Sequence, residues 1–457
     1  MSNYLEVIIL AAGQGTRMRS SLPKVLHPLA GKPLLGHVLD TARQLEPTGI
    51  HVVYGYGGKQ VIDTFEEESV HWAEQVEQLG TGHAVAAALP GVADEATALI
   101  LYGDVPLIGR NTLQRLVNAV SGDRLVLLTA LLDDPHGYGR ILRDRKGRVQ
   151  RIVEQKDATA EERSVCEVNT GMMAMPAARL KEWLGRIEND NVQGEYYLTD
   201  IIALARADGV AVEAVIDDDL EEILGVNDRV QLAALERSYQ RRRAEELMRD
   251  GTMLIDPARF DLRGTLRVGR DVRIDVNVLV EGEVALGDGV TIGANCILRD
   301  AVIGEGTTVE PMSIIEQARI GPNCQVGPFA RIRPGTEMAE GAKVGNFVEV
   351  KKSRIGPGSK VNHLSYIGDT TMGSDVNVGA GTITCNYDGA NKHQTVIGDA
   401  VFIGSDTQLV APVDVADGTT IGAGSTITKD TPVGELTLSR SKQITIKGWK
   451  RPIKKSG

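Results

Sequence analysis

The sequence predicts two unlike domains: an α/β domain with a doubly wound sheet over residues 1–227, and a coil of short parallel strands over residues 251–457, with a connecting helix over residues 228–250. Three observations lead to this prediction. The second half of the chain has a hydrophobic period of six residues, the first half alternates strand and helix patterns, and strong helix formers lie between them. A chain of 457 residues is also too long for one ordinary hydrophobic core.

An aliphatic side chain recurs at every sixth position from Val268 to Ile427, with occasional one-residue slips and one interruption between Gly381 and Thr395. A period of six fits neither an α-helix nor a simple strand alternation, and it predicts short parallel strands that each turn one aliphatic side chain inward. One rung cannot bury its apolar face alone, so the rungs must stack into one continuous core. The predicted inward residues are Val268, Ile274, Val280, Leu286, Ile292, Leu298, Ile303, Val309, Ile315, Ile320, Val326, Ile332, Met338, Val344, Val350, Ile355, Val361, Ile367, Met372, Val378, Ile397, Ile403, Leu409, Val415, Ile421 and Ile427.

Strand and helix patterns alternate through the first half of the chain. The apolar run Val7–Ala12 predicts a strand that is buried on both faces, as the strands of parallel sheets are. Further strands are expected at residues 50–54 and 98–102, and helices at residues 33–45 and 84–89. This alternation is typical of βαβ units in a doubly wound parallel sheet, which binds ligands beyond the carboxyl ends of its strands.

A glycine-rich turn, Gly13–Met18, follows the first predicted strand and contains Arg17, and Lys24 lies a few residues further on. Backbone N–H groups in such a turn can bind phosphates, and the two cations strengthen that interpretation. The turn is neither a P-loop nor a complete dinucleotide motif, so a plain tight turn stays open. Asp104 follows the strand at residues 98–102, at the same edge of the sheet. A carboxylate beside a bound nucleotide is a natural Mg²⁺ ligand, although a helix cap is an equal alternative.

The composition argues against several classes of partner. The formal net charge of −11 does not suit nucleic acid or a membrane surface as the partner of the whole chain. The four cysteines form no CxxC pair, so neither a zinc site nor a disulfide scaffold is indicated. The run Val7–Ala12 is too short for a signal-peptide core or a membrane span. We therefore expect a reduced, cytoplasmic location.

Polar clusters decorate the six-residue period and mark candidate binding positions. Arg333 and Lys351 each flank an inward aliphatic residue, about one coil apart, and His363 lies off the inward positions among hydrogen-bonding neighbours. The interruption holds the polar run Thr384–Lys392, and an insertion in a solenoid forms a loop on one face, often the binding face. For each cluster, a polar turn on a soluble prism is the alternative.

Several of these segments resemble known families. The second half of the chain resembles the left-handed parallel β-helix of hexapeptide repeats, whose members are usually trimers and often acyltransferases. The first half is similar to the Rossmann-like sugar-phosphate nucleotidylyltransferases in Leu10–Met18, Pro23-Lys24 and Tyr102–Asp104. Segments that resemble the base-, sugar- and metal-binding parts of the uridylyl enzymes are Gln75 with Leu79–His83, Gly137–Arg140, Val153–Asp157, Val168–Gly171 and Gly225–Arg229. Nearly the whole chain resembles the bacterial bifunctional N-acetylglucosamine-1-phosphate uridylyltransferase/glucosamine-1-phosphate N-acetyltransferase family.

The resemblance implies that the first domain transfers the uridylyl group of UTP to N-acetylglucosamine-1-phosphate and releases pyrophosphate. Two anions must approach each other, so positioning and charge neutralisation are the main tasks of the protein. Arg17 would be catalytic, and with Lys24 it would neutralise the phosphates. Asp104 and Asn227 would hold Mg²⁺, because oxygen ligands suit a hard cation. The residues implied to bind nucleotide or sugar are Leu10, Ala11, Ala12, Gly13, Lys24, Gln75, Gly80, Thr81, Tyr102, Gly103, Asp104, Gly139, Glu154, Asn169 and Asn227.

The resemblance implies a second reaction in the β-helix, acetyl transfer from acetyl-CoA to glucosamine-1-phosphate. The amine must lose a proton before it attacks, and a neutral imidazole can take that proton, so His363 is the implied general base. Arg333 and Lys351 would pair with the phosphate, and Tyr366 and Asn377 would bond the sugar. The residues implied to contact acetyl-CoA are Ala380, Asn386, Tyr387, Ser405, Ala423 and Arg440.

The two implied reactions would make UDP-N-acetylglucosamine, a precursor of peptidoglycan and lipopolysaccharide, in a homotrimer with small-molecule substrates and no nucleic-acid or membrane partner. Two alternatives remain at this point. A monofunctional sugar-1-phosphate nucleotidylyltransferase with a structural or regulatory β-helix would not need the set of His363, Tyr366 and Asn386-Tyr387. An inert scaffold on a trimerisation stalk would not need the cations and oxygen ligands of the first domain.

Overall fold

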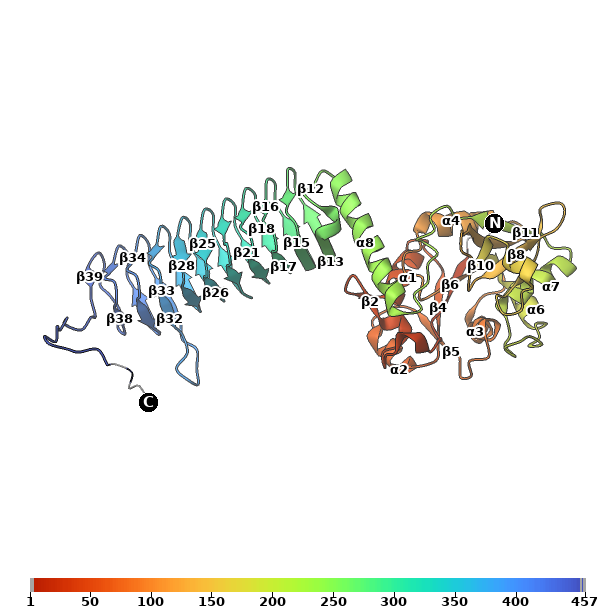
Figure 1. The fold of residues 1–457 in the computed structure, drawn as a ribbon, viewed down its shortest axis with the longest axis horizontal. Coiled ribbons are helices and arrows are strands. Elements are labelled where there is room, and N and C mark those ends of the chain that lie inside the picture. Colours follow the sequence, from red (N-terminus) through yellow and green to blue (C-terminus); the bar gives the residue numbers. More distant parts are fainter. Residues whose placement is uncertain (1–3, 453, 455–457) are drawn as a thin grey trace. The chain divides into compact units, whose positions relative to one another are not determined.

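A computed structural model describes residues 4–452 and residue 454 of the chain (Figure 1). The chain divides between Tyr239 and Gln240 into two compact units. The division falls inside helix α8 (Arg229–Arg249), in the segment for which the sequence predicts a connecting helix. Each unit has a hydrophobic core of its own.

A nine-stranded mixed sheet forms the centre of the first unit. Its main path runs β11-β7-β10-β6-β1-β4-β5, and β8 pairs with β9 and β10 beside this path. Strand β1 pairs in parallel with both β4 and β6, which confirms the predicted doubly wound arrangement. Strand β10 runs antiparallel to β6 and β7, so the sheet is mixed. The sequence could not show this direction, because a strand buried on both faces has the same hydrophobic pattern in either direction. The strands are β1 (Leu5–Leu10), β4 (Gly49–Tyr54), β5 (His71–Glu74), β6 (Thr97–Tyr102), β7 (Leu125–Leu131), β8 (Gly139–Arg143), β9 (Val149–Val153), β10 (Glu167–Pro176) and β11 (Val212–Ile216), with a small separate pair, β2 (Pro28–Leu29) and β3 (Lys32–Pro33).

Helices cover both faces of this sheet, since alternate side chains of β1 enter two different cores. Ile8 packs in a core that includes Val85 of α3 and Trp183 of α6. Ile9 packs in the other core, with Leu35 of α1 and neighbours from α2 and α4. The helices are α1 (Leu34–Arg43), α2 (Gly58–Thr64), α3 (Thr81–Ala88), α4 (Arg110–Ala119), α5 (Ala160–Arg163), α6 (Ala177–Leu184) and α7 (Ile201–Ala207), with the 3₁₀ turns η1 (Thr16–Met18), η2 (Lys24–Leu26), η3 (Leu89–Gly91) and η4 (Leu198–Asp200).

The carboxyl ends of β1 and β6 meet at the predicted binding edge. Hydrogen bonds from Ala11 N to Val53 O (2.8 Å) and from Gly103 N to Leu10 O (2.9 Å) hold the chain in place just beyond the two strands. The glycine-rich turn and Asp104 therefore leave the sheet side by side. This is the switch in strand order at which open α/β sheets bind their ligands.

The second unit is a three-sided parallel β-helix, in which most coils contribute one strand to each of three ladders (Figure 1). Register partners in successive coils are 17 residues apart, as in Val309 and Val326, or 18 residues apart, as in Val326 and Val344. The predicted coil of short parallel strands is confirmed. One ladder contains β12 (Met253–Leu254), β14 (Arg273–Ile274), β16 (Thr291–Ile292), β19 (Thr308–Val309), β22 (Gln325–Val326), β25 (Lys343–Asn346), β28 (Lys360–His363), β31 (Asn377–Val378), β34 (Phe402–Ile403), β37 (Thr420–Ile421) and β39 (Leu436–Thr437).

The other two ladders are joined at their bends into one 17-stranded sheet. Its strands are β13 (Phe260–Val268), β15 (Val278–Leu286), β17 (Ile297–Arg299), β18 (Val302–Ile303), β20 (Ile314–Glu316), β21 (Arg319–Ile320), β23 (Arg331–Ile332), β24 (Glu337–Met338), β26 (Glu349–Lys351), β27 (Arg354–Ile355), β29 (Tyr366–Gly368), β30 (Thr370–Met372), β32 (Ile383–Cys385), β33 (Thr395–Ile397), β35 (Gln408–Val410), β36 (Val413–Val415) and β38 (Thr426–Ile427). The turn η5 (Pro257–Arg259) precedes β13.

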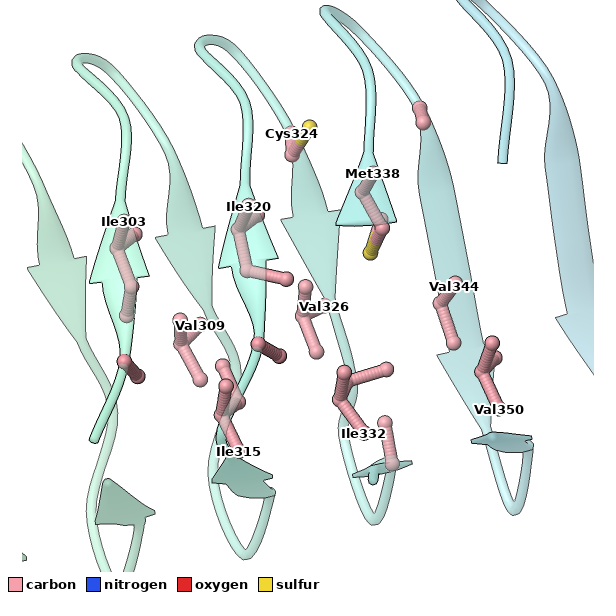
Figure 2. Close-up of a cluster of buried hydrophobic side chains, with 14 of the residues drawn as sticks. Ile303, Val309, Ile315, Ile320, Cys324, Val326, Ile332, Met338, Val344 and Val350 are labelled. Carbon is pink, nitrogen blue, oxygen red and sulfur yellow. The ribbon is translucent and has the colours of Figure 1, made fainter. Parts of the chain in front are cut away.

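The inward side chains stack in columns that continue from coil to coil (Figure 2). Ile303, Ile320 and Met338 are register partners in one such column and are fully or almost fully buried. All of the predicted inward residues are buried except Val268, which is half-buried at the start of the prism. The six-residue period is thus confirmed as the pattern of the core.

The interruption of the period is a lengthened coil inside the prism. Val378 and Ile403 are register partners although 25 residues separate them. Thr384 takes the inward position that follows Val378; it is fully buried, and its Oγ1 accepts a hydrogen bond from Gly368 N at 2.7 Å. A polar side chain therefore keeps the period, and the extra residues form a hairpin loop after β32 (Figure 1).

Helix α8 contributes different side chains to the two cores. Leu235 packs in a cluster with Met18 of the first unit, whereas Ala244 joins the core of the β-helix. The buried Gln240 exchanges two hydrogen bonds with Leu262 of β13, at 3.0 Å from its Nε2 to the carbonyl and 2.7 Å from the backbone N–H to its Oε1. The helix is long but highly charged, and among the described residues no helix is long and apolar enough to cross a membrane.

Candidate active sites

A cavity of about 390 Å³ opens at the carboxyl ends of β1 and β6. Val25, Gln78, Ala84 and Glu195 line it and were not predicted from the sequence. The predicted residues that line it are Leu10, Ala11, Ala12, Gly13, Lys24, Gln75, Gly80, Thr81, Tyr102, Asp104 and Asn227. The predicted residues outside its lining are Arg17, Gly103, Gly139, Glu154 and Asn169.

Lys24 and Asp104 form an ion pair in this cavity, and each side chain is only 15% exposed. Lys24 begins the turn η2, and Asp104 follows β6. Gly15 allows the glycine-rich turn to pass close to Lys24: its φ is +62°, and a Cβ at this position would lie 2.7 Å from the Lys24 Cβ. Both the backbone conformation and the lack of space therefore require glycine here.

Arg17 and Asn227 form a second pair beside the first. Arg17 lies in η1 and donates a hydrogen bond from Nη2 to Asn227 Oδ1 at 2.9 Å. The backbone N–H of Asn227 donates to Gln231 Oε1 at 2.7 Å, which ties this residue to the first turn of α8. Each predicted metal ligand is thus bound by one predicted cation, Asp104 by Lys24 and Asn227 by Arg17.

The oxygen atoms of Asp104 and Asn227 suit a hard divalent cation that arrives with phosphates. Mg²⁺ is commonly bound by one or two protein oxygens and completes its shell with water and substrate phosphate oxygens. Within residues 4–452 and residue 454, no group of three or more His, Cys, Asp or Glu side chains is arranged to hold a metal ion. A donor set of two oxygens fits an ion that is shared with a substrate.

Gly139, Glu154 and Asn169 form a second group next to Tyr102. Gly139 and Asn169 are register partners on β8 and β10, and a Cβ at Gly139 would lie 3.3 Å from Glu154 Oε1. Thr199 Oγ1 donates to the same Glu154 oxygen at 3.1 Å. Burial raises the pKa of Glu154, and two neighbouring carboxylates add to the rise. Burial likewise raises the pKa of Tyr102, with Glu154 as the next cause, so the phenol stays neutral beside the carboxyl group.

The predicted base-reading residues lie around the start of α3. Gln75 is 4% exposed; its Nε2 donates to Gly80 O at 3.0 Å and lies 3.2 Å from His83 Nδ1. Thr81 Oγ1 accepts a hydrogen bond from Leu198 N at 3.1 Å. These bonds hold the loop before α3 in one conformation, with Gln75, Gly80 and Thr81 facing the cavity.

In the β-helix, several predicted residues follow one another along a single corner of the prism. One backbone hydrogen bond joins each coil to the next at this corner: Leu364 N to Asn346 O (3.1 Å), Gly381 N to His363 O (3.4 Å), Asp406 N to Ala380 O (2.8 Å) and Gly424 N to Ser405 O (2.8 Å). His363, Ala380, Ser405 and Ala423 therefore occupy equivalent positions in successive coils, and we name this line the His363 corner. Arg440 continues it, since its Cδ lies 3.6 Å from the position of a Cβ at Gly424.

An exposed apolar ladder occupies the same corner in the coil of His363 and in the coils before it. It consists of Met312, Phe329, Phe347 and Leu364, which are 48%, 46%, 55% and 63% exposed, and all four have a positive φ. The rings of Phe329 and Phe347 stack with their centroids 5.1 Å apart. The ladder ends at Leu364, next to His363, so an apolar surface and a polar surface adjoin at this residue.

His363 is exposed and faces a side-chain amide. It lies on β28 directly over Asn346 of β25, and its Nδ1 is 2.8 Å from Asn346 Oδ1. An amide oxygen only accepts, so Nδ1 carries the hydrogen and Nε2 keeps its lone pair. Asn377, a predicted sugar-binding residue, lies in the next coil on β31, which pairs with β28.

Three cations gather on the neighbouring face. Arg333 and Lys351 lie just after and at the end of β23 and β26, and Arg333 Nη1 donates to Glu349 Oε1 at 2.6 Å. The Lys392 ammonium of the hairpin loop contacts Lys351 and lowers its pKa; desolvation and Arg333 act in the same direction. Two carboxylates, Glu349 and Asp369, lie beside these three cations, which leaves a net positive charge that suits an anion.

Tyr366 and Asn386 meet over Gly368. A Cβ at Gly368 would lie 2.4 Å from the Tyr366 hydroxyl oxygen and 2.8 Å from Asn386 Nδ2. Asn386 is 6% exposed and donates to Asp369 Oδ2 at 2.5 Å, while the next residue, Tyr387, is 59% exposed in the hairpin loop. The loop therefore brings one buried and one exposed predicted residue to this face.

A cavity of about 440 Å³ lies beside these cations, over the corner that contains Lys352 and Asp369. Lys392 and His393 of the hairpin loop also line it. None of the predicted acetyltransferase residues lines it, so these residues lie outside this cavity.

For two of the site residues that were missed, the sequence carried a signal. Lys392 is the one cation of the segment Thr384–Lys392. Asn346 lies 17 residues before His363, which is one coil. Glu195 lines the nucleotide cavity from a loop that has no motif of its own, so no sequence signal could have found it.

Different families of known proteins match the first and the second part of the chain. The MobA-like NTP transferase domain matches residues 7–166, the GMPPB C-terminal domain matches residues 262–384, and six bacterial transferase hexapeptide repeats match residues 394–429. Relatives called bifunctional protein GlmU match nearly end to end. The one from Azoarcus sp. (strain BH72) is 62% identical over 98% of this chain and 100% of its own length. Those from Marinobacter nauticus and Aromatoleum aromaticum are 58% and 60% identical over 98% and 99% of this chain, and 99% of their own lengths.

The doubly wound nucleotide domain and the hexapeptide prism define a two-part transferase, a nucleotidyltransferase joined to a hexapeptide acetyltransferase. The chain belongs to the family of the bifunctional protein GlmU. This confirms the predicted family and its bifunctional class. The two alternatives, a monofunctional nucleotidylyltransferase and an inert scaffold, were wrong.

Replacing Gly15 by alanine should slow nucleotidyl transfer by about tenfold to a hundredfold, because the new Cβ displaces Lys24 from Asp104. Initial rates of pyrophosphate release measure this effect. Gly122→Ala is the matched control, since Gly122 has a similar φ of +59° and nothing within 4 Å of its Cβ position. Equal losses in the two variants would show that backbone strain alone is responsible.

Proposed function

We propose that this chain makes UDP-N-acetylglucosamine in two steps. The β-helix transfers an acetyl group from acetyl-CoA to glucosamine-1-phosphate, and the first domain then joins the N-acetylated product to the uridylyl group of UTP. The observation that carries the proposal is the presence, in one chain, of a cavity with paired cations and oxygen ligands and of an exposed histidine beside a cluster of cations.

Uridylyl transfer requires an oxygen of the sugar phosphate to attack the α-phosphorus of UTP while the bond to the pyrophosphate breaks. Lys24 and Arg17 can exchange their present partners for phosphate oxygens, which frees Asp104 and the Asn227 amide oxygen. A guanidinium and an ammonium are suited to the charge that develops on the departing pyrophosphate. Mg²⁺ held by the freed oxygens would supply further charge neutralisation.

Base and sugar would be recognised by groups that are already held in place. Gln75 and Thr81 face the cavity from the start of α3 and can hydrogen-bond the uracil edge. Glu154 and Asn169 offer a buried carboxyl group and an amide for sugar hydroxyls or the N-acetyl group. Because these groups already have fixed neighbours, binding would order few new side chains.

Acetyl transfer requires a neutral amine that attacks the thioester carbonyl and expels the thiolate of coenzyme A. His363 Nε2 has the free lone pair to accept the amine proton, because Asn346 takes up Nδ1. Arg333, Lys351 and Lys392 would bind the phosphate. The lowered pKa of Lys351 supports this role, since a phosphate would relieve the repulsion between the two lysines.

The His363 corner would carry acetyl-CoA. Successive coils are about 4.8 Å apart, so Ala380, Ser405 and Ala423 form a line that leads away from His363. The side chains along this line are small, and those of Ser405 and Ala423 are exposed, so they leave room for an extended part of acetyl-CoA. Arg440 at its far end can pair with a phosphate of the coenzyme.

The apolar ladder supports a homotrimer. Four adjacent exposed apolar side chains on one corner are costly in water and favour burial against another copy of the chain. Burial of the ladder would bring a second subunit next to His363, which is itself exposed in one chain. The free thiols of all four cysteines suit a reducing cytoplasm.

A coupled assay tests the whole proposal. Glucosamine-1-phosphate, acetyl-CoA, UTP and Mg²⁺ should together yield UDP-N-acetylglucosamine, which chromatography of the products measures. Omission of acetyl-CoA should strongly suppress that product, and N-acetylglucosamine-1-phosphate should restore it without acetyl-CoA. Formation of the acetylated sugar nucleotide without either compound would contradict the proposal.

Asp104→Ala should reduce uridylyl transfer by at least about a hundredfold, because it removes a metal ligand and the partner of Lys24. Acetyl transfer by the same preparation should be unchanged, and it serves as the internal control. Pyrophosphate release and free-thiol formation report the two activities. A variant with ordinary uridylyl activity would remove Asp104 from the metal site.

His363→Ala should reduce acetyl transfer by about a hundredfold to ten-thousandfold, because the amine loses its proton acceptor. Uridylyl transfer should not change. Asn346→Ala should give a smaller loss, since the imidazole remains but is no longer held in one tautomer. A fully active His363→Ala variant would rule out the general-base role.

Phe347→Ser should weaken self-association, because it interrupts the apolar ladder beside the stacked Phe329. Sedimentation velocity over a range of concentrations measures the change. Phe402→Ser is the matched control, since Phe402 is also half-exposed (49%) but lies on β34, outside the ladder. A monomeric wild-type protein, or equal effects of the two substitutions, would contradict the proposed contact.

A further inference from the structure

The amide nitrogen of Gln75 meets two fixed neighbours in the nucleotide cavity. The residue is 4% exposed, and its backbone N–H donates to Tyr54 O at 2.8 Å, so the base of the side chain is held by strand β4. The side-chain Nε2 donates to Gly80 O at 3.0 Å and lies 3.2 Å from His83 Nδ1. Because a carbonyl oxygen only accepts, the contact with Gly80 requires the NH₂ end of the amide on this side.

Gly80 O is a rigid acceptor. It also accepts the first helical hydrogen bond of α3, from Ala84 N at 3.1 Å. Gly80 has a φ of +110°, and a Cβ there would lie 2.6 Å from Tyr196 O, so only glycine fits at this position. To turn toward a flipped glutamine, this carbonyl group would have to give up its hydrogen bond with Ala84 N.

His83 takes up the second hydrogen of the same NH₂ group. Its Nδ1 must then be the acceptor, which assigns the ring hydrogen to Nε2. Both amide hydrogens of Gln75 are then in use, and only its Oε1 remains to hydrogen-bond a ligand. Gln75 is one of the residues that line the cavity. A flipped amide would set Oε1 against two acceptors, Gly80 O and His83 Nδ1.

We propose that His83 acts through Gln75 to set the preference for uracil over cytosine. Uracil presents N3–H, a donor that Gln75 Oε1 can accept. Cytosine presents a bare N3 lone pair at the same place, which an oxygen acceptor repels. His83 needs no contact with the base for this role; it is a positioning residue that keeps the acceptor end of Gln75 toward the nucleotide. The inference rests on the proposed uridylyl transfer.

The test compares UTP and CTP as substrates of the full chain with N-acetylglucosamine-1-phosphate. His83→Leu has no acceptor, and the ratio of kcat/KM for UTP to that for CTP should fall by about tenfold or more. His83→Asn can place its Oδ1 near the position of Nδ1 and should recover most of the ratio. The KM for the sugar phosphate and the rate of acetyl transfer should not change in either variant.

His71→Leu is the matched control, since His71 begins β5, the strand that leads to Gln75, and its side chain is exposed. His83→Ala provides the same comparison if leucine disturbs α3. An unchanged UTP-to-CTP ratio in His83→Leu and His83→Ala, or an equal loss in His83→Leu and His83→Asn, would overturn the inference. A wild-type chain that releases no pyrophosphate from UTP would overturn the proposed function, and the inference with it.

Discussion

Parallel pairing of successive coils is the constraint on which the whole β-helix depends. Neighbouring strands lie about 4.8 Å apart, so each residue lies over its register partner one coil away. This stacking brings Ile303 under Ile320 in the core and, by the same geometry, places His363 directly over Asn346 on the surface. The same stacking therefore aligns the core side chains and the side chains of the candidate site. A change in the length of one coil would shift the register of both. The lengthened coil after Val378 avoids such a shift, because Thr384 keeps the inward position.

In the first unit the main constraint is electrostatic, because charged side chains line a partly buried cavity. Lys24 and Asp104 are each 15% exposed, and an unpaired charge at such a site would be costly. The ion pair satisfies both groups without a ligand, as the hydrogen bond between Arg17 and Asn227 does for its partners. In the proposed reaction a phosphate would replace Asp104 as the partner of Lys24, and Mg²⁺ would become the partner of Asp104, so neither charge would be left unpaired.

Sequence patterns predicted those parts of the structure that follow from local repetition. The six-residue period identified the inward residues, since burial of one side chain per strand is a one-dimensional property of the chain. Strands β1, β4 and β6 and helix α1 were also predicted, because each is long and periodic. The antiparallel direction of β10 was not, since a strand buried on both faces has the same pattern in either direction. The approach of Lys24 to Gly15 was also beyond prediction, because it depends on the path of the loop between them.

The sequence by itself determined the order of the two domains, the period of the prism and the residue types available for chemistry. The tertiary structure alone decided which of these residues meet: that Lys392 reaches Lys351, that Arg440 continues the His363 corner, and that Gln75 turns its amide nitrogen to Gly80 and His83. The reason is physical. Periodicity encodes burial, which acts on each residue separately, whereas a hydrogen bond or an ion pair needs two groups placed within about 3 Å, and that placement results from packing of the whole unit.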